Sequence, residues 1–133
     1  MSFQIFNPEE LGPHSGWNNG LLASGGGRIL FVAGQTGRDA TGRVTAESFA
    51  GQFAGALRNV LRVVQEAGGL PDHIGRLTIY VTDRAEYLAS RHALGEAYRK
   101  ILGRHYPAMA LVEVRGLVDP GAKVEIEATA VLP

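Results

Sequence analysis

Polar and apolar residues alternate strictly along the segment KVEIEATAV, residues 123–131. A period of two predicts a β-strand whose two faces differ in character. One face carries Val124, Ile126, Ala128 and Ala130, and the other carries Glu125, Glu127 and Thr129. Two carboxylates on one face of a strand are either a solvated surface or a pair kept for chemistry. The pattern alone leaves both interpretations open.

Other short segments also carry the pattern of strands, with apolar runs or alternation bounded by glycine, proline or aspartate. The glycines between the first two of them predict that these two strands form a hairpin. The predicted strands span residues 20–24, 28–36, 76–83 and 108–117.

Two helices are predicted between the strands. From Thr45 the apolar residues follow a helical period, and Thr45 is placed to cap this helix while the glycines at 68–69 end it. Asp83, with Glu86 three residues later, has the pattern of an acidic capping box. It predicts a second helix that runs to about Gly103.

The element order predicts an α+β fold in a single domain, residues 1–133: a mixed sheet of four to six strands with two helices packed on one face. The second face of this sheet is expected to be polar. Such a face is compatible with a wet surface, an oligomer interface or a lined cavity. Its expected members are Thr78, Tyr80, Glu113, Arg115, Glu125 and Glu127.

Charge and composition narrow the classes of function. Basic and acidic residues each number 13, so the formal net charge is zero. A balanced chain without basic runs argues against nucleic-acid and membrane partners and favours a small-molecule ligand. Cysteine is absent, and the N-terminal residues lack the features of a secretion signal. We therefore expect a cytoplasmic protein.

The remaining candidates for chemistry are few. The four histidines show no spacing that places two of them on one helix face, so no metal site is expected. Arg91 falls within the apolar stripe of the second helix, where it either extends its guanidinium outward or is buried against a carboxylate. His14 and Trp17, in the loop-like segment GPHSGWNNG, can line a pocket or lie on the surface, and Met109 can be core or ligand contact.

Three segments carry a resemblance to a known family: ILFVAGQTGRDATGRV, AESFAGQFAGALRNVLRVVQEAGG and, most specifically, YPAMALVEVRGLVDPGAKVEIEATAV. Together they resemble the Rid family, the YjgF-like reactive intermediate deaminases, from about Gly12 to Val131. The resemblance implies a chorismate-mutase-like fold that assembles as a homotrimer with small-ligand clefts between subunits. The members with the best-defined activity hydrolyse 2-imino and 2-enamino acids without a cofactor.

The resemblance also assigns roles to residues of this chain. Glu125 falls where the family has the glutamate that positions the attacking water. Gly34 falls on the glycine of one of the family's turns, and His14 falls where the family has an aromatic residue. The largest departure is Met109, which stands where active imine deaminases have an arginine that binds the substrate carboxylate. A thioether has neither charge nor a bidentate donor pair. The candidate replacement cations are Arg91 and Arg115.

Two functional hypotheses follow. The first is a divergent Rid-like deaminase, a hydrolase acting on a small imine, enamine or related compound. The second is a non-catalytic homologue that binds a small ligand or a protein. Glu125 and Glu127 share a face and are expected to differ in role: under the first hypothesis Glu125 handles water, as the resemblance implies, while Glu127 pairs with a neighbour such as Arg76 or Arg115.

Overall fold

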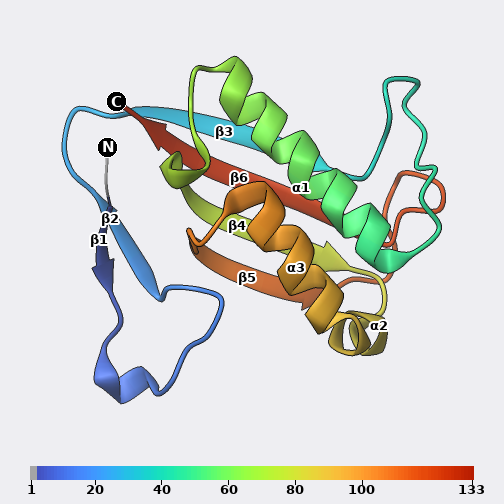
Figure 1. Ribbon diagram of the computed structural model, residues 1–133, viewed down its shortest axis with the longest axis horizontal. Helices are drawn as coiled ribbons and strands as arrows, with labels where there is room; N and C mark the ends of the chain where they lie inside the picture. The colour runs from blue at the N-terminus through green and yellow to red at the C-terminus, as the bar shows by residue number, and fades with distance from the viewer. Residues whose placement is uncertain (1–2) are drawn as a thin grey trace.

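The structure is a computed structural model that describes residues 3–133 (Figure 1). Its strands are β1 (Phe3–Phe6), β2 (Gly20–Ala23), β3 (Arg28–Gln35), β4 (Ile74–Val81), β5 (Ala108–Glu113) and β6 (Val124–Leu132). Its helices are α1 (Phe49–Glu66), α2 (Arg84–Ala89) and α3 (Arg91–Leu102), with short 3-10 turns η1 (Glu9–Leu11) and η2 (Pro71–His73). No helix within residues 3–133 is long and apolar enough to cross a membrane.

The main sheet has the strand order β3-β6-β4-β5. The central strand β6 is antiparallel to both of its neighbours, and β4 is parallel to β5. Helices α1 and α3 lie side by side over one face (Figure 1), and their apolar stripes bury the core against the apolar face of β6 and β4. The predicted α+β fold with a mixed sheet is confirmed.

Helix α1 shows the predicted apolar stripe but not the predicted cap. Ser48 is the N-cap, and its hydroxyl accepts a hydrogen bond from the Gly51 amide at 3.0 Å. Thr45 stays in the preceding loop, because the buried Gln52 side chain donates to the Ala46 carbonyl at 3.0 Å and holds that loop against the helix. The glycine at 68, with φ of +87°, follows the helix end as expected.

The second helical segment is broken at Ser90, so the predicted single helix is in fact α2 followed by α3. Asp83 caps α2 as predicted, accepting from the Glu86 amide at 3.1 Å. The Ser90 hydroxyl donates to the Glu86 carbonyl at 2.8 Å, a local bond by which serine competes with regular helix. The break makes Arg91 the first residue of α3.

The N-terminal region departs most from expectation. The predicted hairpin between residues 20–24 and 28–36 is wrong, because β2 pairs with β1 and forms a separate two-stranded sheet. The long strand β3 pairs instead with β6 over most of its length, and its other edge carries no strand among residues 3–133. Figure 1 shows this small sheet apart from the main one.

Strand β5 places its side chains differently from the expectation as well. Its register with β4 pairs Met109 with Leu77 and Glu113 with Val81, so Met109, Leu111 and Glu113 face the helices. The expected position of Glu113 on the polar face is therefore wrong, and its carboxylate accepts from the Arg84 amide at 2.8 Å. Residues 108–112 are all apolar, and such a run leaves the facing of a strand undetermined.

The face of the main sheet away from the helices is uncovered, and we call it the open face. Polar side chains of β4 and β6 occupy its centre, while apolar side chains of β3 and β5 lie at its sides. Two of these apolar residues are largely exposed, Phe31 at 78% and Ile29 at 63%. Its members include Ile29, Phe31, Thr78, Tyr80, Val112, Glu125, Glu127 and Thr129.

Candidate active site in two parts

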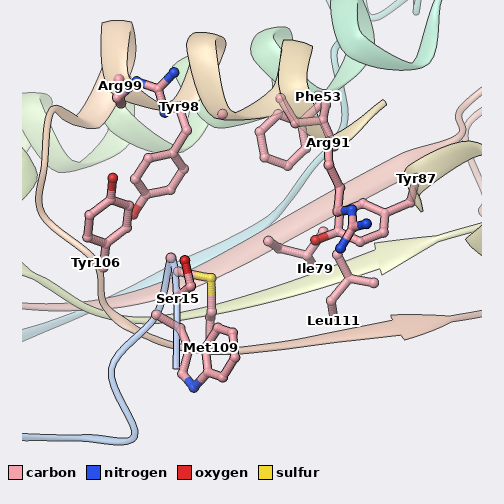
Figure 2. Close-up of a pocket in the computed structure, with 14 residues that line it drawn as sticks. Ser15, Phe53, Ile79, Tyr87, Arg91, Tyr98, Arg99, Tyr106, Met109 and Leu111 are labelled. Carbon is pink, nitrogen blue, oxygen red and sulfur yellow. The ribbon is translucent and has the colours of Figure 1, made fainter. Parts of the chain in front are cut away.

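A pocket of about 630 Å³ lies on the helix-covered side of the sheet, between α3, β5 and the N-terminal loop (Figure 2). This volume is within the usual range for a small-ligand site. The walls are mostly apolar and aromatic. Among the fourteen lining residues are Trp17, Tyr87, Arg91, Tyr98, Tyr106, Met109 and Leu111.

Asparagines hold the N-terminal wall of the pocket in place. Asn18 donates from its backbone amide to the Pro107 carbonyl at 3.2 Å and from its side chain to the Tyr106 carbonyl at 2.7 Å. The Asn18 side chain in turn accepts from Asn7 at 2.8 Å. These bonds fix the loop carrying Ser15, Gly16 and Trp17 beside the start of β5, so a wall separated by some ninety residues from β5 becomes part of one site.

Two stacked tyrosines form the far end of the pocket. The rings of Tyr98 and Tyr106 are nearly parallel, with centroids 5.3 Å apart. The Tyr98 hydroxyl donates to the His105 carbonyl at 2.6 Å, and burial raises the pKa of Tyr98 well above its usual value. Tyr98 therefore remains neutral and serves as a rigid wall, with no role as an acid or base near neutral pH.

The structure brings three of the predicted ligand residues together, since Trp17, Arg91 and Met109 all line the pocket. His14 is adjacent but not part of the lining, and its Nδ1 lies 3.0 Å from the Trp17 carbonyl. Arg91 is exposed, and within residues 3–133 no carboxylate pairs with it, so the interpretation as a buried paired cation is wrong. Met109 is half-buried, packing against the core and facing the pocket at once.

The other two predicted residues meet on the open face. A Cβ atom on Gly34 would overlap the Glu125 carboxylate and would lie 2.9 Å from its Cδ. Any larger residue at position 34 would therefore displace the carboxylate, whereas glycine lets it lie directly against the β3 backbone at the irregularity between Val32 and Gln35. The Glu125 side chain is half-buried.

Glu127 has a partner, but not the predicted one. The Tyr80 hydroxyl donates to Glu127 Oε1 at 2.8 Å, and no ion pair joins Glu127 to Arg76 or Arg115 within the described residues. This hydrogen bond raises the pKa of Tyr80, and the charges of both carboxylates add to the effect. Tyr80 lies directly across from Glu125 in the strand register, so its side chain neighbours one carboxylate and is hydrogen-bonded to the other.

Gln52 sets the position at which the chain enters β6. Its side chain donates to the Gly121 carbonyl at 3.0 Å and accepts from the Lys123 amide at 2.8 Å. Because the same side chain also holds the loop before α1, this buried amide fixes the residue two places before Glu125 relative to the helix layer. Both the amide nitrogen and the carbonyl oxygen of the Gln52 side chain have hydrogen-bond partners, so this buried side chain anchors the two loops in one specific arrangement.

The two groups of predicted residues lie on opposite faces of the sheet. Met109 and Arg91 are on the helix side, while Gly34 and Glu125 are on the open face. A single small molecule cannot contact both parts of one chain through a closed sheet. One ligand can therefore contact both a pocket and a Glu125 carboxylate only if the two come from different chains.

Comparison with known proteins places the chain in a family. Residues 9–132 match the family described as endoribonuclease L-PSP, and the chain belongs to it. This is the Rid, or YjgF-like, family that the sequence motifs resemble.

Three relatives illustrate the similarity. A 2-iminobutanoate/2-iminopropanoate deaminase of Salmonella typhimurium is 32% identical over 105 residues, which cover 79% of this chain and 80% of the relative. A conserved Rid-family protein of unknown function from Yersinia pestis has a solved structure with a TM-score of 0.86 and 29% identity, covering 99% of this chain and 100% of that one. The structure of E. coli TdcF with bound serine has a TM-score of 0.67 and 28% identity, with 92% of each chain covered.

The sequence analysis did not identify the lining residues Tyr98, Arg99 and Tyr106, or Asn18, which anchors the N-terminal wall. The apolar period does not identify the two tyrosines as pocket residues, because one side of an aromatic ring can pack in the core while its other side lines a cavity. The Asn18-Asn19-Gly20 run was a usable signal, since such residues mark a turn whose side chains bind backbone groups.

Proposed function

We propose that this protein is a Rid-like deaminase that hydrolyses a small imine or enamine in a cleft between the subunits of a homotrimer. The observation that carries the proposal is the division of the candidate site. The ligand pocket and the Glu125 carboxylate lie on opposite faces of one chain. If the open face of a neighbouring subunit lies against the pocket, a substrate in the pocket of one chain can meet the Glu125 carboxylate of the other.

The chemistry needs little beyond these two parts. Glu125 accepts a proton from water as the water oxygen forms a bond to the imine carbon, and it passes this proton to the imine nitrogen as the C=N π bond breaks, which gives a carbinolamine. Glu125 then transfers the hydroxyl proton to the amino nitrogen while the C–N bond breaks, so the nitrogen departs as ammonia and a carbonyl compound remains. No redox step or cofactor enters this balance. The pocket holds the substrate so that its C=N carbon meets the water.

The open face supports the assembly. Phe31 and Ile29 are large apolar side chains that remain mostly exposed in the single chain, and neighbouring exposed apolar side chains are typical of interaction surfaces. Burial of this face between copies would remove them from water and partly desolvate Glu125. The resemblance to the Rid family supports three copies as the closed arrangement.

The Salmonella relative supports the reaction class, because its name states deamination of 2-iminobutanoate and 2-iminopropanoate. That relative and this chain are similar over most of both lengths. The proposal takes from it the reaction type, C–N hydrolysis, and not those two substrates.

Mixing two inactive variants tests the division between subunits. Glu125→Gln removes the carboxylate, and Leu111→Trp blocks the pocket by volume. If each site combines the two parts from different chains, trimers assembled from an equal mixture regain up to roughly one quarter of wild-type ammonia release, because that share of sites has both parts intact.

The control is the double variant Glu125→Gln/Leu111→Trp mixed with inactive Glu125→Gln alone, which has no intact carboxylate in any site. Each variant is first checked for wild-type secondary structure and mass. Mixtures of properly assembled single variants that stay as inactive as their components would show that the two parts do not cooperate across subunits.

A second function, binding without catalysis, is favoured by one observation. Met109 gives the pocket a neutral thioether where the resemblance implies a cation, which weakens the capture of a charged substrate. In that case small carbonyl or carboxylate ligands raise the melting temperature, since a ligand that binds only the native state stabilises it. Under this second function the protein binds these ligands but does not release ammonia from the corresponding imines.

A further inference from the structure

The pocket has an unbalanced charge. Of its fourteen lining residues only Arg91 and Arg99 are charged, and none is acidic. Within residues 3–133 neither guanidinium makes a hydrogen bond to a side chain or an ion pair with a carboxylate. Two unneutralised cations beside an apolar cavity favour an anionic ligand.

The two arginines point differently. Figure 2 shows Arg91 reaching from α3 toward β5, with its guanidinium beside Tyr87 and Leu111, while Arg99 lies at the other end near Tyr98. The Arg99 guanidinium follows its own helix, since a Cβ on Gly95 would be 3.3 Å from Arg99 Nη1. Arg91 is therefore the cation directed into the space between helix and sheet.

Helix stability does not explain Arg91. It is the first residue of α3, and the first turn of that helix contains no acidic residue. The N-terminal end of a helix carries partial positive charge, so an arginine there is placed at the unfavourable end. A cation kept at such a position is better explained by an external anion, to which the helix end adds its own attraction.

The rest of the pocket defines the body of the ligand. Met109 and Leu111 lie on the same face of β5, about 7 Å apart as alternate residues of a strand. The Met109 thioether is at the Ser15 end of the cavity and Arg91 is above Leu111 (Figure 2). A ligand held at Arg91 must extend along apolar and aromatic walls to fill the volume toward Met109, the tyrosine pair and Trp17.

We propose that the pocket selects a carboxylate joined to a large apolar or aromatic group, with Arg91 binding the carboxylate and the group packing between Met109 and Tyr98. A planar guanidinium matches a carboxylate with two parallel hydrogen bonds. This assignment rests on the proposed function only in taking this pocket as the substrate half of the site. It makes Arg91 a specificity-determining residue and Met109 part of the surface for the body.

Calorimetric titration with inert probes tests the proposal without turnover. The probes are 3-phenylpropionate, its uncharged amide 3-phenylpropanamide, and propionate, which keeps the charge and lacks the ring. Wild-type protein is expected to bind 3-phenylpropionate at least about tenfold more tightly than either other probe, because each lacks one of the two recognised groups.

Variants then assign the charge recognition to one residue. Arg91→Gln is expected to weaken 3-phenylpropionate binding about tenfold or more and to leave the amide unchanged, whereas Arg91→Lys restores part of the affinity. The matched control is Arg104→Gln, an exposed arginine outside the pocket lining, which should retain wild-type affinity.

Three results would overturn the proposal: no binding of 3-phenylpropionate to wild type, propionate binding as tightly, or unchanged affinity in Arg91→Gln. Failure of the proposed reaction is separate. Arg91-dependent binding without ammonia release from any imine would leave this inference standing and remove the deaminase. Ammonia release that does not depend on Arg91 would leave the deaminase standing and remove Arg91 as the residue that recognises its substrate.

Discussion

The two faces of the sheet differ in both chemistry and completeness. The helix-covered face holds a finished cavity, with apolar walls, fixed aromatic rings and arginines without acidic partners. The open face holds carboxylates, a phenol and exposed apolar side chains, and no helix or strand within residues 3–133 covers them. One face can bind a ligand by itself, while the other has the groups for proton transfer but no walls.

This difference separates binding from chemistry within one subunit. Under the proposed function, recognition depends on groups that are already ordered by the core, whereas Glu125, half-buried in the single chain, is desolvated further when a neighbouring subunit covers it. Ligand binding and turnover should therefore respond to different variants. The following predictions test that separation.

The largest effect is expected from a charge on the open face. Phe31→Asp places a carboxylate in the proposed interface. The free-energy cost of burying an unpaired carboxylate is larger than the stabilisation that the contact between subunits gives at this position. Light scattering should show wild type at about three times the chain mass and the variant at the mass of one chain, without ammonia release. Leu70→Asp, an exposed leucine in the turn after α1, is the control and should remain assembled. A wild-type monomer at micromolar concentration would contradict the divided site.

Glu125 and Glu127 should separate catalysis from stability. Glu125→Gln is expected to lower turnover by about 10²- to 10⁴-fold with the fold intact, the usual contribution of a positioned acid–base group. Glu127→Gln, the neighbouring carboxylate of the same face, should mainly lower the melting temperature, because it weakens the bond from Tyr80. Initial rates of ammonia release and thermal unfolding measure the two effects. Equal catalytic losses would show a coupled carboxylate pair.

Met109→Arg should exchange one substrate preference for another. A guanidinium at this position can bind the carboxylate of a small 2-imino acid, and a charge-assisted hydrogen bond contributes about 1.5–3 kcal/mol, or roughly ten- to hundredfold in kcat/KM. The same side chain fills volume that a large substrate body would occupy. Wild type should be poor on 2-iminopropanoate, and the variant better on it and worse on imines with an aromatic group. The imines are generated by an amino-acid oxidase and followed by competitive trapping. Met109→Leu, which keeps the size and neutrality, is the control.

The smallest effect concerns Tyr80, whose pKa is raised chiefly by the hydrogen bond to Glu127. A pKa raised in the folded state gives a stabilisation that is fully present below the unfolded value of about 10 and is lost as pH rises through the folded value. Tyr80→Phe should therefore melt slightly below wild type at neutral pH, and the difference should disappear in strong alkali. Calorimetric melting across this pH range measures it. A difference that persists above the folded pKa would mean that the ring packing, not the bond, had been lost.

Strict patterns in the sequence predicted structure well, and ambiguous ones did not. The alternation of residues 123–131 and the stripe of α1 are both confirmed, because in each element one face is buried in the core and the other is more accessible. The five successive apolar residues of β5 permitted either facing, so Glu113 was assigned to the wrong side. The break at Ser90 comes from one hydroxyl competing for a carbonyl, which the apolar period does not report.

The site shows the same limit. Glu125 with Gly34, and Met109 with Arg91 and Trp17, were individually identified by residue type and family resemblance. Their grouping depends on long-range contacts, such as the bond from Asn18 to the Tyr106 carbonyl, which joins residues 88 positions apart. No local pattern encodes that pairing, so the pocket walls could not be assembled from the sequence.

The asparagine anchor also has a dynamic consequence. The wall that carries Trp17 is attached by two hydrogen bonds of Asn18 to the carbonyls of Tyr106 and Pro107, just before β5, while its own small sheet is separate from the main one. Segments held in this way open with lower free energy than the core, so the Asn18 amide should exchange its hydrogen with solvent long before the amides of β6. A bound ligand that contacts this wall must slow that exchange. The affinity of the pocket is thus linked to the free energy of closing the N-terminal segment against β5.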